Sequence, residues 1–284
     1  MGDNNWVVEN LQNALSTWNA KLQEIFQLLL TEPEAFRGGG VWAGILEIHD
    51  ALKATGLALL VLFFAAGVVR TTTTHEELRR PERAFRLFLR FVLAKALVTY
   101  GMDVLLALLR IGQGIVGEVV SPSTLDGTLT DATGIWAELP AEVEAAIQQA
   151  GFWESVPLWI VTILGSLVIT VLSFILLMTV YGRFFSIYIH AAVAPIPLAA
   201  FAGEGTSQIG VQFLKSFAGV CLQGAVIALA CAIFTTFAAA PPALGGTGAV
   251  QLVWNYVAEL AFNLLVLVGA VKLSERLCKE MLGL

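Results

Sequence analysis

Residues 157–181 contain no aspartate, glutamate, lysine or arginine. An α-helix rises 1.5 Å per residue, so about 20 apolar residues cross the roughly 30 Å hydrocarbon core of a bilayer. This segment is long enough to span. Only 13% of the chain is charged, against about 25% in soluble domains. The sequence therefore predicts an all-α, polytopic transmembrane helix bundle.

Other apolar segments predict further spans. Residues 56–69 are charge-free but too short to cross, so their helix must begin earlier, near Trp42 or Asp50. A second span covers residues 87–109, and the last two lie within 209–239 and 250–271.

Residues 184–202 form an ambiguous apolar stretch, because Pro195 and Pro197 break its helix. It either crosses the membrane with a kink or enters and returns as a re-entrant segment.

Residues 1–40 form a separate N-terminal region that is too polar to span. Its large apolar residues recur every three or four positions, which predicts an amphipathic helix. The helix lies either at the membrane interface or against a partner protein, and Gly38, Gly39 and Gly40 then provide a flexible joint. The apolar residues are Trp6, Leu11, Leu15, Trp18, Leu22, Ile25, Phe26 and Leu29.

Charge asymmetry predicts the orientation. Arginines cluster between and beside the first two spans, at Arg70, Arg79, Arg80, Arg83, Arg86 and Arg90. Residues 111–155 contain no lysine or arginine and carry acidic residues at Glu118, Asp126, Asp131, Glu138, Glu142, Glu144 and Glu154. Cytoplasmic loops are enriched in basic residues. We therefore expect the acidic loop and the N-terminus outside a cytoplasmic (inner) membrane.

The same rule favours the re-entrant arrangement of residues 184–202. With five crossings, Lys215 and the tail that holds Lys272, Arg276 and Lys279 are cytoplasmic. The predicted regions are an N-terminal helix (1–40), two spans with a basic loop (41–111), an acidic extracytoplasmic loop (112–155) and a C-terminal bundle (156–284).

Catalytic and metal-binding patterns are missing from the sequence. It has no phosphate-binding glycine loop, no HExxH and no GxSxG. His49, His75 and His190 are scattered, and the three cysteines form no CxxC pair. We therefore predict a non-enzymatic protein with no cofactor or metal.

Two polar stripes interrupt the apolar segments. Lys95, Thr99 and Asp103 recur every four residues in the second span, and Asn255, Glu259 and Asn263 do so in the last. Ionisable groups at membrane depth are unfavourable unless they face protein or water. The stripes form either a polar conduit or interface, or pairs that only fix helix packing.

Small residues repeat every four positions in the segment 209–239, at Gly224, Ala228 and Ala232. Such spacing permits close helix approach in a membrane, although it is common by chance in alanine-rich spans.

Residues 181–205 read YGRFFSIYIHAAVAPIPLAAFAGEG, and KSFAGVCLQGAVIALA follows from Lys215. This block and the topology resemble the TrbL-type polytopic inner-membrane subunit of conjugative type IV secretion systems, in the form carried by integrative elements of Gram-positive bacteria. The resemblance implies a homo-oligomeric channel subunit in contact with membrane lipid, with energy-supplying ATPases and transiently with single-stranded DNA bearing an attached protein. It also implies that Pro195 and Pro197 form the membrane-embedded break.

A small-molecule transporter or ion channel is the main alternative, because it would also explain the charged residues inside the spans. Such proteins usually show internal repeats or more intramembrane charge. A membrane enzyme would need a nucleophile, base or metal set, and none is recognisable.

Overall fold

The computed structural model describes residues 5–72, 81–120, 139–238 and 248–284, and these residues form helices without strands. Among them, four helices are long and apolar enough to cross a membrane, and a bent pair makes a fifth candidate. The predicted polytopic helical bundle is confirmed. The helices are α1 (Asn5–Leu30), η1 (Phe36–Gly39), α2 (Gly40–Thr72), α3 (Pro81–Thr99), α4 (Gly101–Val120), α5 (Ala141–Gln149), α6 (Phe152–Val193), α7 (Pro195–Ala199), η2 (Ala200–Ala202), α8 (Ser207–Ala238) and α9 (Ala249–Met281).

Two compact units divide the chain. The first comprises Met1–Leu30, Val116–Tyr181 and Ala225–Ser274, and the second comprises Thr31–Ile115, Gly182–Gly224 and Glu275–Leu284. Helices α4, α6, α8 and α9 each contribute residues to both units.

In the first unit, α1 buries the apolar face that the sequence predicts. Leu11, Trp18 and Leu22 are fully buried, and the ring of Trp6 meets that of Trp159 in α6 edge to face. Most of the apolar stripe therefore packs against other helices of the chain.

Part of the predicted acidic loop is helical. Residues up to Val120 extend α4, and α5 follows with Val143 and Ile147 fully buried and with contacts to α1. The predicted loop acids Asp126, Asp131 and Glu138 lie outside the described residues, as do the loop arginines Arg79 and Arg80.

In the second unit, the predicted second span is not one straight helix. It divides into α3 and α4, which meet at Tyr100 with a bend of 69°. Gly101 lies at this corner, where a Cβ atom would sit 2.6 Å from a methyl carbon of Leu198 in α7. Gly101 thus packs closely against α7 at this corner. Asp103 lies in the first turn of α4, not on a helix shared with Lys95.

The third span and the start of the ambiguous stretch form one helix. α6 runs unbroken to Val193 and includes residues 184–193, and only the remainder of 184–202 forms the short helices α7 and η2. α6 ends at Val193, α7 begins at Pro195, and Pro197 lies inside α7. The expected separate segment does not begin at 184, because residues 184–193 continue α6. Arg183 lies within α6 and is buried.

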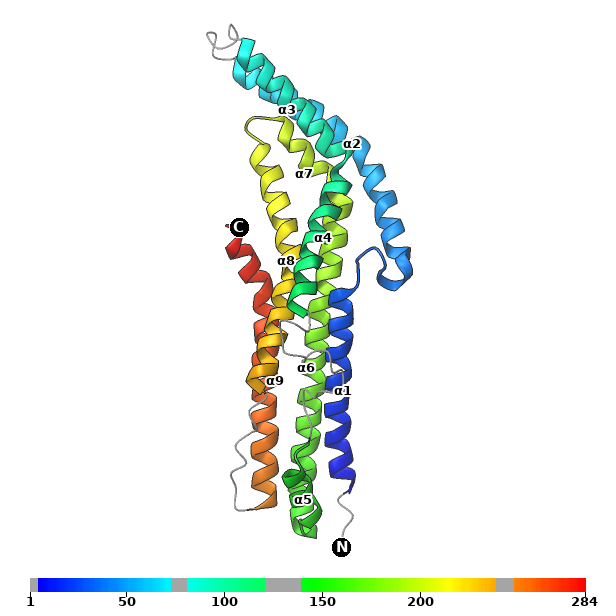
Figure 1. The fold of residues 1–284 in the computed structure, drawn as a ribbon, viewed down its shortest axis with the longest axis vertical. Coiled ribbons are helices and arrows are strands. Elements are labelled where there is room, and N and C mark those ends of the chain that lie inside the picture. The colour runs from blue at the N-terminus through cyan, green and yellow to red at the C-terminus, as the bar shows by residue number, and fades with distance from the viewer. Residues whose placement is uncertain (1–4, 73–80, 121–138, 239–247) are drawn as a thin grey trace. The chain divides into compact units, whose positions relative to one another are not determined.

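In Figure 1, α2 and α3 lie side by side, with α7 against both. The first predicted span begins early, as expected, because α2 starts at Gly40 and includes Glu47, His49 and Asp50.

Candidate functional site

The break between α6 and α7 leaves one backbone carbonyl without its helical partner. Pro195 has no N–H to donate to the carbonyl of Ala191, four residues earlier. The Nδ1 atom of His49 in α2 lies 2.8 Å from that oxygen, and His49 is buried. A carbonyl only accepts hydrogen bonds, so Nδ1 carries the proton. His49 thus replaces the hydrogen bond that Pro195 removes.

Glycine allows α2 to approach this break closely. A Cβ atom on Gly56 would lie 2.6 Å from the carbonyl oxygen of Pro195, and one on Gly203 would lie 2.9 Å from the carbonyl oxygen of Phe63. Pro195, Leu198, Ala199, Ala200 and Ala202 are buried, whereas Ile196, Pro197 and Phe201 are half-buried. The proline break is therefore a packed core of the second unit.

The linker before α2 packs onto the same end of α6. The ring of Phe36 stacks on that of Phe184 with centroids 4.4 Å apart, and the Tyr188 hydroxyl donates to the carbonyl of Pro33 at 2.9 Å. Arg37, Gly38 and Gly39 adopt positive φ angles. The predicted glycine joint is thus a turn tied to α6.

A buried arginine follows on α6. Arg183 is 3% exposed, its Nε donates to the carbonyl of Val220 at 3.3 Å, and no acidic side chain among the described residues pairs with it. A Cβ atom on Gly224 would lie 2.5 Å from the guanidinium carbon. Gly224 therefore makes room for the Arg183 guanidinium, while Ala228 and Ala232 are buried in the first unit.

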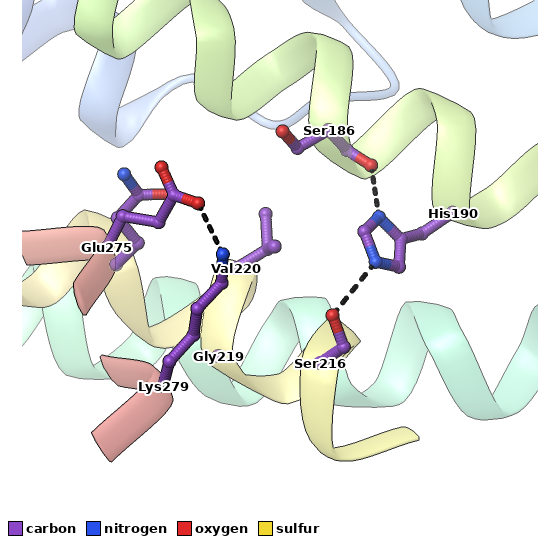
Figure 2. Close-up of a pocket in the computed structure, with 8 residues that line it drawn as sticks. Ser186, His190, Ser216, Gly219, Val220, Glu275 and Lys279 are labelled. Carbon is purple, nitrogen blue, oxygen red and sulfur yellow. Dashed lines mark hydrogen bonds and ion pairs between the residues drawn. The ribbon is translucent and has the colours of Figure 1, made fainter. Parts of the chain in front are cut away.

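A small pocket of about 90 Å³, lined mainly by polar residues, lies between the second-unit parts of α6, α8 and α9 (Figure 2). His190 places Nδ1 2.7 Å from the carbonyl of Ser186 and Nε2 3.2 Å from the hydroxyl of Ser216. Nδ1 therefore donates to the carbonyl and Nε2 accepts from Ser216. Lys279 and Glu275, four residues apart on α9, also line the pocket and pair at 2.6 Å.

The Ser216–His190 pair resembles a nucleophile and its base in arrangement, but its surroundings favour a different role. Small-molecule sites usually enclose about 300–1,000 Å³, so this pocket holds little more than water. The rings of Phe213 and Phe217 also pack against His190. The pocket is therefore a hydrogen-bonded contact between α6 and α8, and no group of three metal-binding side chains occurs among the described residues.

The predicted charges on α3 and α4 have a different setting. Lys95 and Asp103 are exposed, Thr99 is half-buried, and neither charge has a hydrogen bond or ion pair with any residue that the structure describes. They lie within the bent pair, whose residues 85–120 are apolar enough to span. The chain therefore presents two opposite, uncompensated charges around one corner.

The second stripe lies in the first unit. Asn255, Glu259 and Asn263 are half-buried on α9. Asn255 has a polar partner, whereas Glu259 and Asn263 have none within the described part of the chain. The two stripes belong to different units, so each is a separate feature.

Comparison with known proteins adds one finding. A family model described as TrbL/VirB6 plasmid conjugal transfer like protein matches residues 18–195, more than half of the chain. The chain belongs to the TrbL/VirB6 family. The match contains Lys95, Asp103, Arg183 and Pro195, and it ends before α8 and α9. No curated protein and no solved structure matches this TrbL/VirB6 chain.

His49 and Arg183 are site residues that the sequence does not reveal. The sequence signal for a donor such as His49 is Pro195, which leaves the carbonyl of Ala191 without its helical hydrogen bond. The position of Pro195 alone does not show which residue donates in its place. Arg183 follows an apolar run and therefore resembles a flanking charge.

Proposed function

We propose that this TrbL/VirB6 chain is a homo-oligomeric channel subunit of a conjugative type IV secretion machine, which assists the passage of single-stranded DNA with an attached protein. Family membership supports a role as a conjugal transfer component. Partner ATPases supply the energy. The protein lies in the cytoplasmic membrane, with the N-terminus outside and the C-terminus in the cytoplasm.

The unpartnered pair Lys95 and Asp103 carries the proposal of self-association. Isolated charges in a membrane are unfavourable and usually face protein or water. Both charges are exposed on the single chain, and they have opposite signs. A second copy supplies the missing partner when Lys95 of one subunit meets Asp103 of the next, and such a repeated contact forms a closed ring if its rotation closes.

A charge exchange tests this contact in transfer-competent cells. We expect Lys95→Asp and Asp103→Lys each to reduce transfer frequency by at least tenfold, because like charges then meet. The double exchange should restore most of the transfer by re-forming opposite pairs. Arg276→Gln is the control, since Arg276 is exposed and pairs with Glu280 only on the tail.

Equal loss in both single variants and in the double exchange, with normal amounts of protein, would contradict the subunit contact. Affinity purification from native membranes tests the partners separately. Conjugation ATPases should co-purify in a large complex. A small homo-oligomer without them, from transfer-competent cells, would contradict the channel-subunit role.

A solute transporter or ion channel is the second candidate, favoured by the same unpaired charges and by Glu259. Uptake of a defined solute by proteoliposomes containing only this chain, lost in Glu259→Gln, would support it over the secretion role.

A further inference from the structure

We propose that a groove of the second unit, between α3 and the η2–α8 corner, binds one anionic phospholipid. The cavity measures about 440 Å³, within the range of about 300–1,000 Å³ typical of small-molecule sites. Its lining includes Arg86, Leu89, Arg90, Leu93, Leu97 and Phe201.

The groove has an apolar wall suited to an acyl chain. Leu89, Leu93 and Leu97 recur every four residues on α3, so they form one continuous row along the helix. Leu89 is 47% exposed and Leu93 is 56% exposed, so the chain leaves this row uncovered. Phe201 of η2 closes the opposite wall.

The groove also has two cations at one end. Arg86 and Arg90 lie four residues apart and therefore share a face of α3. Arg86 is exposed and has no hydrogen bond or ion pair with a described residue. Arg90 approaches Glu204 only at 3.9 Å, and that carboxylate is 62% exposed. A guanidinium group can donate two parallel hydrogen bonds to two oxygens of one phosphate, so a phosphodiester headgroup fits this end of the groove.

A nucleic-acid strand would use the same arginines but would leave the leucine row uncovered. Sequence-independent strand binding combines basic grooves with several aromatic platforms on which bases stack, and the lining residues include one aromatic ring, Phe201. The combination of two arginines with an uncovered aliphatic row therefore favours a lipid.

Binding of the full-length, delipidated protein to phosphatidylglycerol, measured by native mass spectrometry, tests the proposal. Phosphatidylcholine serves as the neutral lipid. We expect phosphatidylglycerol to bind preferentially and the Arg86→Gln/Arg90→Gln variant to lose roughly thirtyfold in affinity. Leu93→Trp, which fills the groove, should also lose binding.

Two matched controls distinguish the groove from general effects. Val92→Trp adds the same ring on an exposed position of α3 outside the lining, and Arg276→Gln removes a distant exposed arginine. Both should bind like the original protein, and circular dichroism with size-exclusion elution reports folding of every variant.

Three outcomes would overturn the proposal. Equal binding of the two lipids, or equal loss in Leu93→Trp and Val92→Trp, would show that the groove is not the site. An oligodeoxynucleotide that binds through Arg86 and Arg90 while phosphatidylglycerol does not would assign the arginines to nucleic acid. Loss of DNA transfer by the charge variants of Lys95 and Asp103 would not alter these results, because neither residue lines the groove.

Discussion

The α6–α7 break and the α3–α4 corner both interrupt apolar helices of the second unit, but they differ in cause and surroundings. Pro195 causes the first, and His49 and Gly56 of α2 cover it. No proline lies at the second, where Gly101 packs against Leu198 and the nearby charges Lys95 and Asp103 stay uncovered. Because the chain completes the first corner alone, we assign it to stability and assign the second to contacts outside the chain.

The largest expected effect is that of Gly56→Ala. The new methyl group would overlap with backbone and ring atoms of Pro195, and only a movement of α2 would relieve this overlap. Overpacking typically costs about 1–3 kcal/mol and occasionally more. We expect a strong fall in Tm and yield in detergent.

Gly44→Ala is the matched control for that change. Gly44 lies on the same helix with nothing within 4 Å of its Cβ position, so alanine there should be neutral or slightly stabilising. Equal Tm values for the two variants would show that α2 does not press on the α6–α7 break.

The next effect is that of His49→Leu, which removes the donor to the carbonyl of Ala191. A buried carbonyl left without a partner costs about 1–3 kcal/mol, so thermal unfolding of the purified protein should occur earlier. His49→Gln keeps an N–H donor and should recover part of the loss. If His49→Leu matched the original protein, the replacement hydrogen bond would have no energetic role.

Tyr188→Phe should have a smaller effect. It removes only the hydroxyl that donates to Pro33 and keeps the ring against Phe36 and Trp42. A typical hydrogen bond contributes about 0.5–1.5 kcal/mol. A denaturation series that gave a loss as large as that of Gly56→Ala would indicate that the linker, and not α2, secures the end of α6.

The smallest effect on stability is expected from Lys95→Ala, since Lys95 has no polar partner among the residues that the structure describes. Exposed substitutions usually change stability by less than about 0.5 kcal/mol. In the dispersed monomer, its Tm should equal that of the original protein. A clear fall would mean that Lys95 is paired within the chain and would remove the contrast between the two corners.

The sequence predicts the features that depend on local pattern. Apolar length predicts the membrane helices, a period of three to four residues predicts α1, and the missing N–H of Pro195 predicts the end of α6. The corner at Tyr100 has no such signal, because an apolar stretch with one glycine also suits a straight helix. At this bend Gly101 lies against Leu198, which is distant in sequence.

Contacts between residues distant in sequence likewise determine which polar residues are buried. Arg183 follows a charge-free run and therefore suits the end of a span, but the space left by Gly224 keeps it inside the protein. The repeat of small residues predicts close approach at Gly224, whereas the group that approaches is a guanidinium. From the sequence alone, His49 resembles an interfacial residue. Only the structure shows that it donates to the carbonyl of Ala191.

Cross-linking between subunits tests the central claim most directly. Cells would express two differently tagged copies, one with Lys95→Cys and the other with Asp103→Cys, and their membranes would be treated with a short bifunctional thiol reagent. We expect a mixed covalent dimer. In the control, the second copy carries Met178→Cys, at an exposed position of α6, in place of Asp103→Cys. The mixed dimer should then be much less abundant. A mixed dimer no more abundant than in that control would contradict the proposal that the α3–α4 corner joins copies of this chain.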